Sequence, residues 1–263
     1  MKVALHYYSG AGNTKFIAKK LKKNLVARSH EVDLIRVNSK SVLAVELGYD
    51  LYIIGFPVYD ISSPALVKDL VSKITDEGKP VAYFNTKAFM SGDSILELAN
   101  VSNSNGLKLV AFQDFYMPAS DALALFAKKG STTEKIIKFF HTRNIDDKLE
   151  GFVTRIDNNQ EIKIKPKWYN ILAYLIPKSV KEAFHNQYTV YIPEFYSDNN
   201  ICIECMLCVN QCPRENIKFD EGIKFDLNCD MCLSCLHHCP VDAIEIGTMT
   251  KGNVRLRKIE INN

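Results

Sequence analysis

Short apolar runs and amphipathic segments alternate along the first half of the chain. Runs rich in Val, Ile, Leu and aromatic residues predict β-strands at 3–8, 32–37, 51–56, 81–84 and 107–112. Apolar residues at helical spacing predict helices after the first strand, at 65–74, and after Gly92. Repeated strand–helix units are typical of a parallel, doubly wound sheet, which binds its ligand beyond the carboxyl ends of the strands.

Two sequence signals mark the starts of helices. Ser63-Pro64 offers a capping side chain and a first-turn proline for the helix at 65–74. The run Ser131-Thr132-Thr133-Glu134 matches a capping box and predicts a last helix that continues through Phe139 and Phe140. Residues 115–120 follow the fifth strand, so we expect them at the ligand edge of the sheet.

A glycine-rich loop at residues 9–14 joins the first strand to the first helix, with the sequence Ser9-Gly10-Ala11-Gly12-Asn13-Thr14. Such a loop aims backbone N–H groups and the positive end of a helix at one point, which favours a phosphate group. A Walker loop would end in G-K-[ST], and a dinucleotide loop would have a third glycine where Lys15 stands, so both are excluded. By itself the loop fits a plain tight turn equally well.

Two more loops are expected at the same edge of the sheet, at 57–62 and 85–92. Tyr59, in the earlier of these, is either an ordinary packed aromatic residue or a flat face for a flat ring. Together with the glycine loop, the segments Gly55-Phe56-Pro57-Val58-Tyr59 and 85–92 resemble the flavodoxin family over residues 1–145. The resemblance implies a five-stranded doubly wound α/β sheet of strand order 2-1-3-4-5, with bound FMN.

The resemblance to flavodoxins also implies which residues bind FMN. Around the phosphate it places Ser9, Gly10, Gly12, Asn13 and Thr14. Ala11 is counted with this loop but departs from the family pattern, because a threonine hydroxyl often donates to the phosphate there. Tyr59 would lie near the isoalloxazine ring. The other expected cofactor contacts come from the second and third loops: Pro57, Val58, Asp60, Asn85, Thr86, Lys87, Ala88, Phe89, Ser91 and Gly92.

All eight cysteines lie between residues 202 and 239, in two runs of the pattern C-x-x-C-x-x-C-x-x-x-C-P. The second run repeats the spacing of the first, so that Cys229 corresponds to Cys202 and Cys239 to Cys212. Each run is a tight loop that turns three thiolates toward one point, as a compact 4Fe-4S cluster with four thiolate ligands requires. Zinc sites favour two separated pairs of ligands, and a disulfide framework requires a secreted chain, so both alternatives fit less well.

From Asp198 onward the chain closely resembles two-cluster bacterial ferredoxins, in which the fourth ligand of each cluster comes from the other run. The resemblance implies a first 4Fe-4S cluster held by Cys202, Cys205, Cys208 and Cys239. It implies a second cluster held by Cys229, Cys232, Cys235 and Cys212. We assign no ligand role to His185, His237 or His238, and expect them to face solvent or flank a cluster.

Charge is distributed unevenly along the 263 residues, which carry +3 overall. From residue 198 to the end there are 7 Lys and Arg against 10 Asp and Glu, so the first 197 residues carry +6. The basic residues are dispersed rather than gathered in a stripe, which disfavours a nucleic-acid partner. No apolar run reaches the roughly 18 residues of a transmembrane helix, and no cleavage site follows the first ten residues. We therefore expect a cytoplasmic protein.

Three segments are expected along the chain: an FMN-binding domain at 1–146, an aromatic-rich linker at 147–197 and a small α+β ferredoxin-like domain at 198–263. Within the linker, the proline-bounded stretch 166–177 contains the only tryptophan. We interpret this stretch as a clasp that packs one domain on the other. A membrane-surface helix and a partner-binding face are the alternatives.

As a whole the chain resembles flavodoxin–ferredoxin fusion proteins of anaerobic prokaryotes. A 4Fe-4S cluster passes one electron at a time and FMN holds one or two, so we expect an electron relay that exchanges electrons with a redox protein donor or acceptor. No catalytic residue is required in such a relay. One alternative is a flavoenzyme, fed by the clusters, that reduces a quinone or nitro compound. The other is a scaffold without FMN. The oligomeric state is left open.

Overall fold

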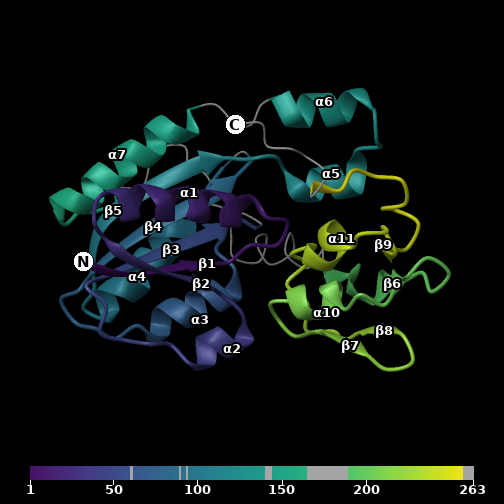
Figure 1. Cartoon of the computed structure of the whole chain (residues 1–263), viewed down its shortest axis with the longest axis horizontal. Helices are drawn as coiled ribbons and strands as arrows, with labels where there is room; N and C mark the ends of the chain where they lie inside the picture. The colour runs from purple at the N-terminus through teal and green to yellow at the C-terminus, as the bar shows by residue number, and fades with distance from the viewer. Residues whose placement is uncertain (60–61, 89, 93, 140–143, 165–188, 257–263) are drawn as a thin grey trace. The chain divides into compact units, whose positions relative to one another are not determined.

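The computed structural model describes residues 1–59, 62–88, 90–92, 94–139, 144–164 and 189–256 (Figure 1). The chain divides into two compact units. The first consists of Met1–Ser9, Asn13–Met117 and Arg143–Pro177, and the second of Gly10–Gly12, Pro118–Thr142 and Lys178–Asn263. The predicted clasp at 166–177 and His185 lie outside the described residues.

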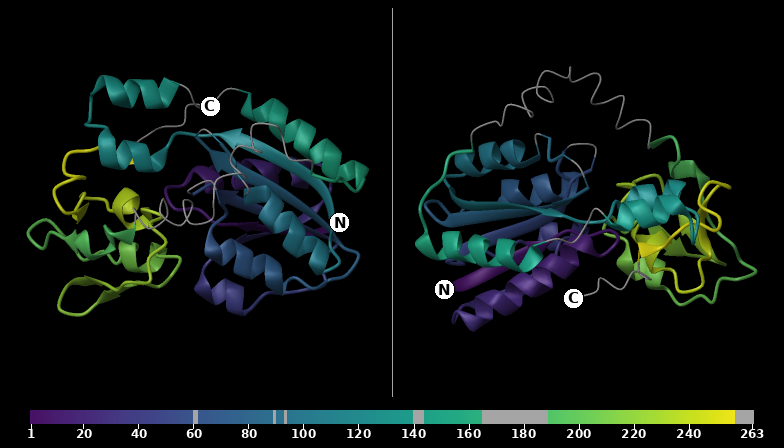
Figure 2. Two further views of the ribbon diagram at one scale, coloured as in Figure 1. Left: turned by 180° about the vertical axis from the view of Figure 1, so that it is seen from behind. Right: turned by 90° about the horizontal axis from the view of Figure 1, so that it is seen from above.

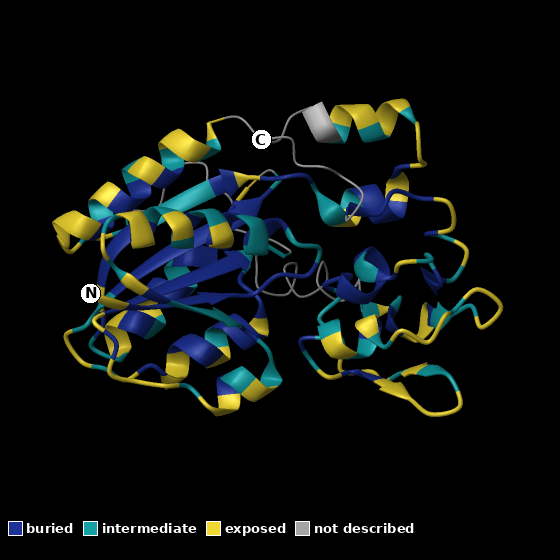
Figure 3. Ribbon diagram, viewed as in Figure 1, coloured by how far each residue is buried: buried dark blue, intermediate teal, exposed yellow. Residues whose placement is uncertain are grey.

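The first unit is built on one parallel sheet, as predicted. Neighbouring strands follow the order β2-β1-β3-β4-β5. The side chains of β1, β3 and β4 are almost entirely buried, so these strands form the interior of the unit (Figure 3). The bounds are β1 Lys2–Tyr7, β2 Glu31–Arg36, β3 Leu51–Pro57, β4 Pro80–Lys87 and β5 Lys108–Tyr116.

Helices cover both faces of this sheet (Figure 1; Figure 2). On one face lie α1, Asn13–Ala27, and α7, Ile145–Asn158. On the other lie α2, Ser39–Leu43, α3, Ala65–Lys73, and α4, Ser94–Ser104. The start of α3 differs in detail from the prediction, because Pro64 occupies the N-cap position and makes no side-chain cap bond.

Helix α7 occupies the start of the segment that we expected to be a linker. It buries Leu149, Phe152, Val153 and Ile156, which recur at helical spacing along one face. The ring of Phe152 lies 6.4 Å from the ring of Phe84 in β4, measured between centroids. The start of the expected linker is therefore a helix of the first unit, because its apolar face packs on the sheet.

Two further helices belong to the second unit, although their sequence precedes α7. These are α5, Ser120–Phe126, and α6, Thr132–Phe139. The backbone N–H of Glu134 donates to Ser131 Oγ at 3.2 Å, so α6 is capped where the sequence predicts. The Glu134 carboxylate accepts from the N–H of Gly130 at 2.6 Å, which makes this a variant of the capping box.

The rest of the second unit consists of short elements, several of which occur twice at equivalent positions of the two cysteine runs. Strand β6, Phe195–Ser197, pairs antiparallel with β9, Ile244–Ile246, and β7, Ile217–Phe219, pairs antiparallel with β8, Ile223–Phe225. A 3₁₀ turn, η1, spans Ile192–Glu194. The short helices α10, Leu207–Gln211, and α11, Ser234–His238, occupy equivalent positions in the two cysteine runs, and β7 and β9 follow those runs at equivalent positions. Among the described residues, no helix has the length and apolar character needed to cross a membrane.

Candidate functional site

The loop between β1 and α1 has the local geometry of a helix start. Gly12 adopts a φ of +109°, a backbone conformation that residues other than glycine rarely adopt. Helix α1 begins at the next residue, Asn13. The backbone N–H of Lys15 donates to Ser9 Oγ at 3.3 Å, so Ser9 serves the first turn of the helix as an acceptor.

Two predicted cofactor loops meet at the carboxyl edge of the sheet in the first unit. The hydroxyl oxygens of Thr14 and Thr86 lie 2.8 Å apart and are buried. From the second loop, the N–H of Val58 donates to the carbonyl oxygen of Thr86 at 3.0 Å. The end of β4 is therefore hydrogen-bonded to both neighbouring loops.

The second loop is closed by hydrogen bonds between its own residues and is held in place by neighbouring side chains. Tyr59 and Ser62 exchange two backbone hydrogen bonds, of 3.1 and 2.8 Å. The ring of Tyr59 packs edge-on against the buried ring of Tyr8, with centroids 6.2 Å apart. Ser62 Oγ donates to a carboxylate oxygen of Glu97 at 3.0 Å, and Lys68 pairs with the same oxygen at 2.9 Å. These contacts hold Tyr59 at the edge of the sheet, while Asp60 lies outside the described residues.

The third loop contains a buried ion pair that sequence reasoning did not find. Lys87 Nζ lies 2.7 Å from Asp114 Oδ2 and 2.6 Å from Ser91 Oγ, and Ser91 Oγ donates to Asp114 Oδ1 at 2.8 Å. Lys87 also lies over the ring of Tyr116, 5.1 Å from its centroid. Asp114 was missed because β5 continues past the predicted strand end at residue 112, and the place of Asp114 opposite Asn85 appears only where β5 lies beside β4. Phe89 lies outside the described residues.

Asn85, at the same edge of the sheet, is a buried polar residue that indicates a ligand site. It is fully buried, and neither atom of its amide has a hydrogen-bond partner among the described residues. Burying an amide without partners costs free energy, and such groups in native proteins normally have a partner. Asn85 therefore fits a site that receives a donor and an acceptor from a bound polar ligand.

In the second unit, the eight thiols line two recesses. The first recess is lined by Cys202, Cys205, Cys208 and Cys239. The second recess is lined by Cys212, Cys229, Cys232 and Cys235. Each recess thus takes three cysteines from one run and the last cysteine from the other. No three His, Cys, Asp or Glu side chains in the described part of the chain gather closely enough to hold a single metal ion.

The backbone around the two recesses repeats residue by residue. Left-handed conformations, rare outside glycine, occur in pairs at equivalent positions of the two halves: Glu204 and Met231, Met206 and Leu233, Glu215 and Asp242. The N–H of Asn216 donates to Cys212 Sγ at 3.2 Å, and the N–H of Ala243 donates to Cys239 Sγ at 3.1 Å. These turns therefore direct backbone donors at sulfur in both halves.

The thiols of each recess interact electrostatically with one another. Burial raises the pKa of Cys208 to about 11, and the charges of Cys239 and Cys202 add to this effect. Burial likewise raises the pKa of Cys229 to about 11, with Cys212 as a further cause. A thiol held in such a place ionises only if positive charge is supplied nearby.

The two histidines that precede Cys239 are hydrogen-bonded to the backbone. His237 is fully buried, so the solvent-facing alternative does not apply to it, and its Nδ1 accepts from the N–H of Leu256 at 3.1 Å. His238 Nδ1 lies 2.9 Å from the carbonyl oxygen of Ser234. Both residues flank the second cysteine run.

No protein-family model matches the chain, and no curated protein matches it. Solved structures do match. Flavodoxin 2 from Bacillus cereus has a TM-score of 0.45 and 19% identity over 60% of this chain and 99% of its own. The Streptococcus pneumonia TIGR4 flavodoxin has a TM-score of 0.44 and 15% identity, and the match covers 61% of this chain and 100% of that flavodoxin. A Lactobacillus acidophilus flavoprotein, solved in complex with FMN, has a TM-score of 0.35 and 19% identity, and the match covers 43% of this chain and 92% of that flavoprotein. Identities this low concern the fold alone.

Proposed function

We propose that this protein relays single electrons between two 4Fe-4S clusters and FMN. The sorting of eight thiols into two recesses of four carries the proposal. In each recess the donor set is three cysteines of one run and the last cysteine of the other, which is the set that a pair of 4Fe-4S clusters requires.

The residues of the second unit fit these clusters in charge as well as in number. Thiols with a raised pKa need a nearby cation in order to ionise, and iron supplies that charge. The N–H groups of Asn216 and Ala243 donate to cysteine sulfur and stabilise its negative charge. Bound clusters would supply one-electron oxidation and reduction. The protein would hold them in a fixed mutual arrangement, with few exposed thiols.

The carboxyl edge of the first unit fits FMN. The start of α1 after Gly12 offers N–H donors and a positive helix end for the phosphate. Asn85 offers an unsatisfied buried amide for the polar edge of the ring, and Tyr59 offers an aromatic face. FMN accepts one or two electrons, so its presence in the same chain would join one-electron carriers to two-electron chemistry.

The partner implied by this function is another redox protein, which donates or accepts electrons. Reduced thiolates are maintained in the cytoplasm, which is the compartment we propose. The small-substrate alternative differs only at the flavin: there, a quinone or nitro compound would take the electrons directly.

Anaerobic purification followed by cofactor analysis tests the proposal. We expect about eight iron atoms and one FMN per chain, with stepwise bleaching of both chromophores on reduction. Protein with intact clusters and no flavin, even after incubation with FMN, would contradict the relay and favour a scaffold. Turnover of a quinone at the rate of oxidation by protein carriers would instead favour the enzyme.

A further inference from the structure

The two recesses are equivalent in their cysteines but not in their exposure. Cys205 is exposed, whereas Cys232, its equivalent in the second run, is only 8% exposed. Another pair of equivalent positions differs in the same way: Leu207 is 39% exposed, whereas Ser234 is buried. Electron tunnelling weakens steeply with distance, so an exposed thiolate is the shortest route out of a cluster. The first recess is the one that offers such a route.

Apolar side chains border the exposed thiol. Ile203 is 60% exposed, Ile201 is 46% exposed, and both Ile203 and Leu207 also line the first recess. Single exposed apolar residues are ordinary on protein surfaces, but a group of them marks an interaction site. We name Ile201, Ile203, Glu204, Cys205 and Leu207 the rim of the first recess.

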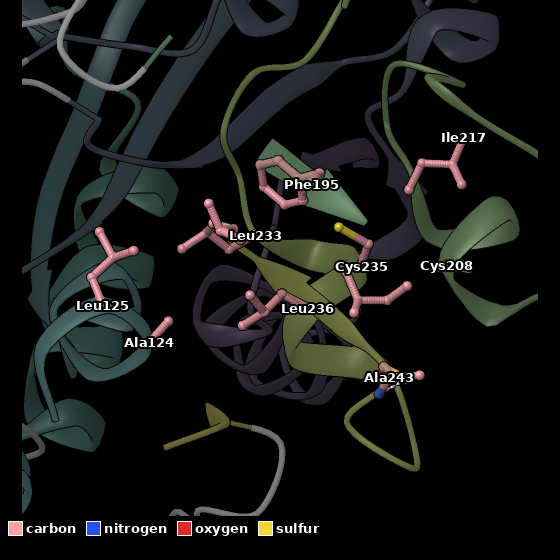
Figure 4. Packing of buried hydrophobic residues seen from close by; sticks show 12 residues of the cluster. Ala124, Leu125, Phe195, Cys208, Ile217, Leu233, Cys235, Leu236 and Ala243 are labelled. Carbon is pink, nitrogen blue, oxygen red and sulfur yellow. Dashed lines mark hydrogen bonds between the residues drawn. The ribbon is translucent and has the colours of Figure 1, made fainter. Parts of the chain in front are cut away.

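The corresponding positions of the second recess are polar or covered. Asn228, Asp230 and Ser234 replace the three apolar residues of the rim. Asp230 forms an ion pair of 2.8 Å with Arg214. Leu233 and Leu236 pack in one apolar cluster with Ala124 and Leu125 of α5 (Figure 4). Near Cys232 and Cys235, the second recess is therefore covered by the protein's own core.

Two exposed acidic residues lie at or near the rim. Glu204 is exposed within it, and Glu221 is exposed in the turn between β7 and β8. This turn lies near the rim, since Ile223, the next residue after Gly222, lines the first recess together with Ile203 and Glu204. In the part of the chain that the structure describes, neither Glu204 nor Glu221 takes part in an ion pair. Unpaired acidic residues beside an apolar patch attract a partner with basic residues around an apolar centre.

We propose that the rim of the first recess is the docking surface for an external redox protein with basic residues around its exposed cofactor. This inference rests on the proposed function, because the electron leaves through the cluster that the first recess would hold. One electron passes to the partner's oxidised centre, no proton is transferred, and the cluster returns to its oxidised state. The second recess then exchanges electrons only inside the protein.

Stopped-flow oxidation tests the docking surface with cytochrome c, a basic haem protein, as the probe. The dithionite-reduced full chain, freed of excess dithionite, is mixed anaerobically with ferric cytochrome c at low and high salt. The variant Ile203→Ser with Leu207→Ser should lower the second-order rate constant at least about fivefold. The matched control is Leu227→Ser, which removes an apolar side chain that is 73% exposed outside the rim. We expect it to change the rate less than about twofold.

A charge variant gives an independent measure. Glu204→Lys should slow the reaction at low salt and weaken its dependence on ionic strength, because a steering charge has been reversed. The serine variant should lose less of its rate with the small complex hexaamminecobalt(III) than with cytochrome c, since the small oxidant needs no docking. Equal effects of the rim and control variants, or a larger effect of Leu227→Ser, would overturn the docking surface while full iron content upheld the clusters. Wild-type protein without iron would overturn the proposed function and the docking surface together.

Discussion

Thr14 and Thr86 touch through their hydroxyl groups, whose oxygens lie 2.8 Å apart in the interior of the first unit. Thr14 belongs to the first turn of α1, and Thr86 lies at the carboxyl end of β4. The bond therefore ties the glycine loop to the third loop, although 72 residues separate them. Both loops were predicted to contact the same cofactor, and this hydroxyl pair fixes the distance between them.

Replacing Thr86 by Val removes one hydroxyl from this buried pair. We expect Thr86→Val to lower the free energy of unfolding by about 1–2 kcal/mol, because Thr14 loses its partner in a place that water does not reach. FMN affinity should fall as well. Urea unfolding and fluorescence titration with FMN measure the two effects. Thr133→Val, at an exposed position of α6, is the control and should cost less than about 0.5 kcal/mol.

The ion pair of Lys87 and Asp114 should behave as a buried pair. Lys87→Met leaves the Asp114 carboxylate with one hydrogen bond, from Ser91, and should destabilise the first unit by about 3 kcal/mol. Adding Asp114→Asn removes the stranded charge, so the double variant should recover about half of that loss. Urea unfolding of the two variants measures this coupling. Simple addition of the two single costs would show that the pair does not act as a unit.

His6 makes the first unit sensitive to acid. Burial in β1 lowers the pKa of His6 to about 4, from an unperturbed 6.5. Between these values the unfolded chain binds a proton that the folded chain does not, so stability falls as the pH is lowered from 6.5 toward 4. From pH 7 to pH 5 wild-type protein should lose about 2 kcal/mol more than His6→Leu.

The ring signals of His6 give a direct check on this titration. In two-dimensional NMR spectra they should not shift above pH 5, and the signal absent from His6→Leu identifies them. A midpoint near 6.5 for these signals would contradict the buried, neutral ring. The acid-dependent stability difference between the two proteins would then have to vanish as well.

Much of the first unit follows from local sequence alone. The strands were predicted because runs such as Val3–Leu5 and Ile53–Ile54 are buried on both faces, which leaves a continuous apolar signal. The loops at the ends of β1, β3 and β4 were predicted because glycine, proline and polar residues follow each strand. Asp114 was not predicted, since its role appears only where β5 lies beside β4.

The grouping of α5 with the second unit depends on contacts that local patterns do not reveal. The N–H of Val254 donates to the carbonyl oxygen of Ala127 at 2.9 Å, and the amide of Asn253 donates to the carbonyl oxygen of Ala124 at 2.8 Å. These bonds join residues more than 120 positions apart, so neither partner carries a signal by itself. Ser63 illustrates the same limit, because it hydrogen-bonds Glu97 instead of capping α3.

The exchange of ligands between the two cysteine runs can be tested one cysteine at a time. Cys212→Ser should remove or weaken the cluster of the second recess, since Cys212 lines that recess with Cys229, Cys232 and Cys235. Cys239→Ser should affect the other cluster, which makes the two variants controls for each other. Electron paramagnetic resonance of the reduced proteins distinguishes the clusters. Loss of the first-recess signal in Cys212→Ser would refute the exchange.

The ion pair of Arg214 and Asp230 should give the two clusters different reduction potentials. Arg214 directly follows Pro213, Asp230 directly follows Cys229, and the two side chains lie 2.8 Å apart. Apolar Val241 and Ile203 occupy the equivalent positions around the first recess. Asp230→Asn leaves the cation of Arg214 beside the second recess, which favours the added electron. The potential of that cluster should rise by on the order of 50 mV, and the other potential should stay within error.

Redox titration monitored by electron paramagnetic resonance measures both potentials in one sample. Asp226→Asn is the matched control, because Asp226 also lines the second recess but is exposed and paired with Lys218. Solvent screens such an exposed charge, so its removal should shift the potential by less than half as much as Asp230→Asn. Equal shifts in the two variants would show that net charge, and not the half-buried pair of Arg214 and Asp230, sets the difference. A fall in potential for Asp230→Asn would contradict the electrostatic role of Arg214 itself.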